Sequence, residues 1–166
     1  MQAKQMLRRF LRWRVKHISN RQFVLIMSIV VGLGSGLAAV VIKNTTHLIQ
    51  AFLISDAVKD YHTYLYFVYP MLGIGLTVLV VKYVIKRPVG HGIPSALYAI
   101  SKRNGIIPRN NMFRSIFTSA LTVGFGGSVG LEGPTVATGS AIGSNVARIM
   151  HLNYKTRILL IACAAA

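Results

Sequence analysis

Residues 130–134 read Gly-Leu-Glu-Gly-Pro, and the surroundings of this short stretch decide the fold. Glu132 is the only charged residue in the 33 residues from Ser115 to Ala147. A carboxylate in so apolar a run is costly to remove from water, and inside a membrane segment such a residue marks a functional site by default. The flanking glycines and proline interrupt the run, so backbone amides are left free to meet an anion. The stretch therefore points to anion transport.

Apolar runs of membrane-spanning length lie upstream of this stretch. The segments Gln22–Ile42 and Tyr61–Val81 are 21 residues each and contain no Lys, Arg, Asp or Glu. A helix needs about 20 apolar residues to cross the hydrocarbon of a bilayer. We expect Pro70 to kink the second run. With 53% apolar residues in a chain of 166, the sequence predicts an all-α, multi-pass integral membrane protein.

The basic residues set the expected topology. The net charge is +16, but the basic residues cluster between apolar segments instead of lining one polar face, so we exclude nucleic acid as a partner. Residues 1–21 carry seven basic residues and are predicted to form an amphipathic helix on the cytoplasmic face of the membrane. A basic tail that only sets topology is the alternative. Residues 22–166 form the membrane domain, and Lys43–Asp60 is the expected outer connection.

The second half of the chain consists of short and interrupted apolar segments. Pro94–Ser101 is too short to span a bilayer, and 111–128 and 134–149 are each about one short span. A further helix begins at Tyr154, and the chain stops inside it, so we expect a piece of a longer protein. Broken and tilted helices of this kind indicate the binding site of a transporter.

Small residues predict where helices pack closely. The pairs Gly32 and Gly36, and Gly139 and Gly143, each have the four-residue spacing that brings two helix backbones together. Cys163 lies in a run of small residues, where we expect a buried thiol.

A second break, Gly-His-Gly-Ile-Pro at 90–94, has the same shape as the break at 130–134. Proline is favoured at the first position of a helix, so we expect helices to begin at Pro94 and Pro134. Each helix start presents unpaired amides and the positive end of its dipole. Two such starts aimed at one point would hold an anion without a full countercharge. The alternative is that each break is only a loop between helices.

The two breaks resemble the motifs of the CLC family of chloride channels and chloride/proton antiporters. In that family a Gly-Ser-Gly-Ile-Pro loop opens one helix of the anion pathway, and a Gly-(Lys/Arg)-Glu-Gly-Pro loop opens another. The order and separation of the two motifs fit this family, and the resemblance extends over the whole chain. It implies an inverted-repeat membrane fold of which this chain holds the first part.

The resemblance also implies the functional residues and partners. Glu132 matches the gating glutamate, whose carboxylate occupies an anion position when charged and moves away when neutral. The implied protein is no enzyme, has no cofactor besides the transported chloride, and is a homodimer in a bacterial inner membrane or a plasma membrane, with its N-terminus in the cytoplasm. The residues carried over as anion-binding are Gly90, His91, Gly92, Ile93, Leu131 and Gly133.

Two departures from the family pattern bear on selectivity. His91 stands where the family has a serine that contacts the central anion, so the choice between chloride and nitrate is open. Leu131 replaces the usual basic residue beside the glutamate, which weakens the positive field there. The sequence does not decide between channel and exchanger. Two other readings stay open, namely a different broken-helix transporter that uses Glu132 to carry protons for an organic anion, and a membrane anchor without transport.

Overall fold

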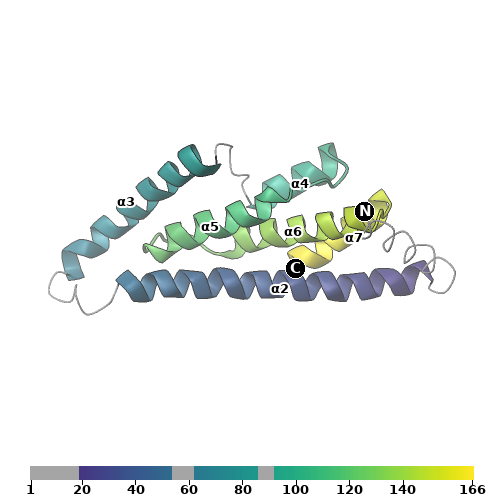
Figure 1. Cartoon of the computed structure of the whole chain (residues 1–166), viewed down its shortest axis with the longest axis horizontal. Helices are drawn as coiled ribbons and strands as arrows, with labels where there is room; N and C mark the ends of the chain where they lie inside the picture. The colour runs from purple at the N-terminus through teal and green to yellow at the C-terminus, as the bar shows by residue number, and fades with distance from the viewer. Residues whose placement is uncertain (1–18, 54–61, 86–91) are drawn as a thin grey trace, which may run out of the picture.

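The computed structural model describes residues 19–53, 62–85 and 92–166 (Figure 1). Its helices are α2 (Asn20–Leu53), α3 (His62–Val80), α4 (Gly92–Lys102), α5 (Asn110–Gly124), α6 (Glu132–Ile149) and α7 (Tyr154–Ala165), and a π-helical turn, η2 (Val81–Ile85), follows α3. Within the described ranges there is no strand. The predicted all-α fold class is confirmed.

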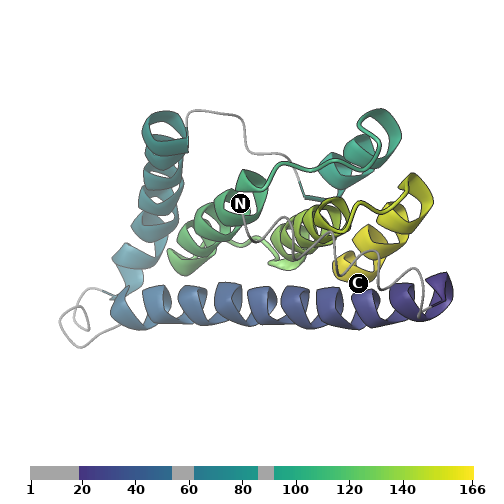
Figure 2. The ribbon, with the colours of Figure 1, turned by 45° about the vertical axis from the view of Figure 1, so that its right-hand side comes forward.

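Helix α6 lies at the centre of the arrangement. It packs against α2, α4, α5 and α7, whereas α3 packs against α5. Figures 1 and 2 show α2 running along the whole length of the molecule, with α5, α6 and α7 beside it and α4 on the other side of α6. The motif around Glu132 thus opens the helix that has the most neighbours.

The contact between α6 and α7 is close because α6 presents glycines there. A side chain on Gly139 would collide with the carbonyl oxygen of Ala164, and a Cβ on Gly143 would lie 3.0 Å from the Cα of Ile161. The close packing predicted for this glycine pair is therefore confirmed. The adjoining core is apolar and comprises Phe23, Met27, Val31, Ala147, Leu152, Leu160 and Ala164.

The first glycine pair does not pack as predicted. A Cβ on Gly32 or Gly36 would meet no atom within 4 Å, whereas a Cβ on Gly34 would lie 3.7 Å from Ile142. The reason is helical register, since Gly34 continues the buried stripe that contains Val31, and the other two glycines lie off it. The prediction of a buried Cys163 is also wrong, because this thiol is exposed.

The first membrane run is part of a longer helix than predicted. The helix was expected to end at Ile42, but α2 continues to Leu53, through much of the expected connection. Residues 43–53 contain no glycine or proline that would stop a helix. Packing then holds them, because Ile49 contacts Gly124 and the Nε2 of Gln50 donates to the carbonyl of Val123 at 3.4 Å.

The second apolar run forms α3 close to its predicted bounds, with Pro70 inside the helix. The kink expected at Pro70 stays a prediction. Among the described helices, α2 alone is long and apolar enough to cross a membrane, and the apolar part of the next one covers Val68–Tyr83. Of the basic segment 1–21, only the last three residues are described, and α2 begins there at Asn20.

The connection from α4 to α5 is fastened to α6 and α7. The Oγ of Ser144 donates to the carbonyl of Gly105 at 2.6 Å and accepts from the amide of Ile107 at 2.9 Å. The guanidinium of Arg157 donates to the carbonyl of Asn104 at 2.9 Å. The hydroxyl of Tyr154 donates to the carbonyl of Ile100 at 3.2 Å. The last turn of α4 and the connection after it are therefore held by polar contacts from two other helices.

Candidate anion-binding site

Both Gly–Pro breaks lead directly into helices, but the helices begin two residues earlier than predicted. Helix α4 begins at Gly92 and α6 at Glu132, so Pro94 and Pro134 are third residues instead of first. The first turn of a helix tolerates proline because its amides have no partner within the helix. Glu132 consequently belongs to the first turn of α6.

The two helix starts touch each other through their glycines. A Cβ added to Gly92 would lie 3.1 Å from both the Cα and the carbonyl oxygen of Gly133. Gly92 also has φ +24°, a backbone conformation that residues with a side chain rarely adopt. The sequence placed these two motifs 40 positions apart, and the fold brings their backbones into contact.

Glu132 stands in open space beside this contact. Its side chain is exposed and has no hydrogen-bond or ion-pair partner among the described residues. A Cβ on Gly130 or on Gly133 would meet no atom within 4 Å. The motif therefore leaves room for the carboxylate to change position.

The start of α6 presents free backbone amides. The first hydrogen bond of the helix runs from the amide of Thr135 to the carbonyl of Leu131 at 3.0 Å, and the Thr135 hydroxyl donates to the same carbonyl at 2.7 Å. The amides of Glu132 and Gly133 precede that bond, so the helix supplies them with no acceptor. Such a start, with its partial positive charge, attracts an anion or a carboxylate.

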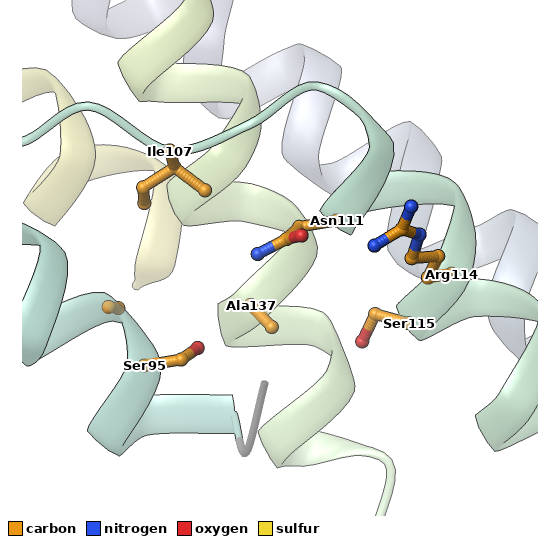
Figure 3. Close-up of a pocket in the computed structure, with 7 residues that line it drawn as sticks. Ser95, Ile107, Asn111, Arg114, Ser115 and Ala137 are labelled. Atoms are coloured by element: carbon orange, nitrogen blue, oxygen red, sulfur yellow. The ribbon is translucent and has the colours of Figure 1, made fainter. Parts of the chain in front are cut away.

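Helix α5 supports this start from the side. The Oγ of buried Ser115 donates to the carbonyl of Pro134 at 3.3 Å. A cavity of about 10 Å³, room for a single water molecule, lies between α4, α5 and α6. Figure 3 shows Ser95 and Ser115 on opposite sides of Ala137, with Asn111 and Arg114 lining the same cavity from α5.

The structure separates the predicted site residues into three groups. Gly92 and Gly133 meet, and Leu131 precedes the helix that Glu132 begins. Ile93 is 52% exposed and presents an apolar side chain. Gly90 and His91 lie outside the described residues.

Sequence reasoning missed two residues of α5 near the site, Arg114 and Ser115. The available signal was the position of Arg114, which is the last charged residue before the stretch in which Glu132 is the only charge. Its guanidinium is the cation that lines the small cavity between the two helix starts and α5.

Comparisons with known proteins give one match. No curated protein and no solved structure matches the chain. The family model described as voltage gated chloride channel matches residues 73–166, which is more than half of the chain and includes both Gly–Pro breaks. The match does not extend to α2, although the resemblance was expected over the whole chain. Members of this family are membrane-embedded channels and transporters, not enzymes. The chain therefore belongs to the voltage-gated chloride channel family.

Proposed function

We propose that this chain contributes part of a chloride pathway in which the starts of α4 and α6 hold the anion and Glu132 is the gate. The observation that carries the proposal is the contact between Gly92 and Gly133. It brings the N-termini of two helices from separate motifs to one place, which is the arrangement that an anion site without a bound countercharge needs.

Electrostatics supports the same assignment. Each helix start carries roughly half a positive elementary charge, and two adjacent starts add their fields. Glu132 is the only acid among the described residues, and it sits in the first turn of α6. A charged Glu132 competes with a permeant anion for the same amides, whereas a neutral one releases them. A site built from amides holds an anion without trapping it, as conduction requires.

Further features of the proposal come from the resemblance to the CLC family. We infer that the complete protein is a homodimer in a bacterial inner membrane or a plasma membrane, with its N-terminus in the cytoplasm. The resemblance assigns Gly90 and His91 to the anion site together with Gly92, and His91 would influence which anion passes. Ile93, Leu131 and Gly133 line the same path.

The test replaces Glu132 with glutamine, which imitates the neutral carboxyl and keeps its size. In the complete protein reconstituted in liposomes, we expect Glu132→Gln to retain chloride flux, to lose the dependence of flux on pH, and to abolish any coupled proton movement. The measurements are chloride efflux and pH change inside the vesicles. A glutamine variant that folds but conducts no chloride, or keeps the wild-type pH response, would remove Glu132 from the gate. Proton movement in the wild type decides between exchanger and channel.

A further inference from the structure

Positive charge gathers at the end of α6 opposite to Glu132. Figures 1 and 2 show the first turn of α2, the last turns of α4 and α6, and the first turn of α7 at the same end of the molecule. Contacts agree with this placement, because Phe23 of α2 and Leu152 before α7 share one core cluster, and Tyr154 of α7 bonds to α4. The exposed cations of this end, named here the basic surface, are Arg21, Lys102, Arg103, Arg148 and Lys155.

No described carboxylate neutralises the basic surface. Glu132 is the only acid among the described residues and lies in the first turn of α6, whereas Arg148 lies in its last turn. The helix rises about 24 Å between the two, and salt screens charges beyond about 8 Å at physiological ionic strength. Within the described part of the chain, the charge of this surface is therefore left for anions from outside to balance.

The start of α7 carries a charge opposite to the one that its position favours. Lys155 lies in the first turn of α7, and that turn contains no acidic residue. The cap residue Asn153 accepts from the amide of Thr156 at 3.1 Å, whereas the helix supplies no acceptor to the amides of Tyr154 and Lys155. A helix start attracts anions, and a cation there adds to its positive field. Electrostatics is therefore relieved when an anion from outside binds at this turn.

Large apolar and aromatic side chains lie exposed among these cations. Tyr98 is exposed on α4, and the guanidinium of Arg103 lies 5.6 Å from the centre of its ring. Ile149 and Tyr154 are exposed beside the cations of α6 and α7. Cations mixed with exposed aromatic rings are typical of the boundary between a membrane and water. A phosphate group carried on a lipid matches this mixture, because the acyl chains pack against apolar side chains while the charge meets the cations.

We propose that the basic surface binds the phosphate groups of anionic phospholipids, with the start of α7 at its centre. By the positive-inside rule, so basic an end faces the cytoplasm, where the leaflet carries anionic lipids. The chain belongs to a membrane-embedded family, so these lipids are its neighbours. The proposal does not depend on the role of Glu132, since the surface lies at the other end of α6.

The experiment compares unfolding temperatures of the complete protein in detergent micelles that contain phosphatidylglycerol or phosphatidylcholine with the same acyl chains. We expect phosphatidylglycerol to raise the unfolding temperature of the wild type more, because a ligand that binds the folded state stabilises it. Lys102→Gln/Arg148→Gln/Lys155→Gln removes most of the difference between the two lipids. Lys155→Gln alone raises the phosphatidylglycerol concentration needed for half of the effect about five-fold, the share of one cation near an anionic surface.

Lys43→Gln is the matched control, because Lys43 is also an exposed cation of α2, about 33 Å along the helix from Arg21. It leaves the effect of phosphatidylglycerol at its wild-type size. Lys102→Arg/Arg148→Lys/Lys155→Arg keeps every charge and retains the effect. All these side chains are exposed, so each variant has an unfolding temperature close to that of the wild type in detergent alone. The six basic residues of segment 1–18 stay in every variant.

Three results would overturn the proposal. The first is an equal effect of phosphatidylglycerol and phosphatidylcholine on the wild type. The second is a triple glutamine variant that keeps the full wild-type difference. The third is a rise with inorganic phosphate alone as large as that with phosphatidylglycerol, which would make the surface a site for soluble anions. Chloride flux enters none of these measurements, so they stand or fall independently of the gate.

Discussion

The body of α6 and the break at its start use glycine in opposite ways. In its middle and second half, Gly139 and Gly143 face α7 so closely that a side chain would meet the carbonyl oxygens of Ala164 and Leu160. At its start, Gly130 and Gly133 face open space, with no atom within 4 Å of a Cβ built on either. The same residue type thus removes all free space in one region and leaves space in the other.

This difference divides α6 into a part that packs tightly on α7 and a start that leaves space around Glu132. The close contact with α7 fixes the axis of α6, because backbone packed on backbone has no side chain that can adjust. The free space at the start leaves room around the Glu132 carboxylate. The proposed gate, with a rigid backbone and one mobile side chain, would use both kinds of glycine.

The largest effect is expected from filling the close contact. Gly139→Val would force α6 away from Ala164, and we expect a loss of about 3 kcal/mol or more in the free energy of unfolding, or no folded protein. Gly36→Val is the control, since it makes the same change at a helical glycine with no atom within 4 Å. Thermal unfolding in detergent compares them. Equal stabilities would show that the α6–α7 contact is not close.

An intermediate effect is expected where the two helix starts touch. Gly92→Ala places a methyl group 3.1 Å from the Gly133 backbone at a φ of +24°, and we expect it to lower the free energy of unfolding by roughly 1–3 kcal/mol. Gly133→Ala points into open space, so its stability stays within about 1 kcal/mol of the wild type. Both are compared by unfolding midpoint. If Gly133→Ala lowered the unfolding midpoint more than Gly92→Ala, the assignment of Gly92 to the close side and Gly133 to the open side would be reversed.

The smallest effect concerns a buried hydroxyl between the two ends of α6. The Thr138 side chain is fully buried, and its Oγ1 has no hydrogen-bond partner in the described structure. Thr138→Val keeps the shape and removes the unpaired hydroxyl, so we expect a gain of about 1 kcal/mol in the free energy of unfolding. A higher unfolding temperature in detergent checks this. A loss of similar size would mean that the hydroxyl has a partner, such as a bound water molecule.

The sequence was informative where local chemistry decides the structure. The two Gly–Pro breaks predicted two helix starts, and helices begin within two residues of the predicted positions. The glycine pair of α6 predicted a close helix contact. Asn153 caps α7 by accepting from the amide of Thr156 at 3.1 Å, in agreement with the helix expected from Tyr154. Local signals of this kind do not depend on distant neighbours.

The sequence was uninformative where contacts between distant segments decide the structure. The last turns of α2 pack on α5, where Ile49 lies against Gly124, and nothing in the sequence indicated this contact. The misassigned pair Gly32 and Gly36 has the right spacing but the wrong face, because the packed face is set by the partner helix.

Helix α4 is held near both ends, by α6 at its start and by α6 and α7 at its last turn and the connection after it. Its first residue, Gly92, rests on Gly133, and its last turn and the following connection are held by Ser144 of α6 and by Tyr154 and Arg157 of α7. A short helix held near both ends cannot pivot as a rigid body without breaking one set of these contacts. Under the proposed function, opening and closing would then require only a rotation of the Glu132 side chain, a movement that takes nanoseconds or less in exposed residues, with the helices as its frame.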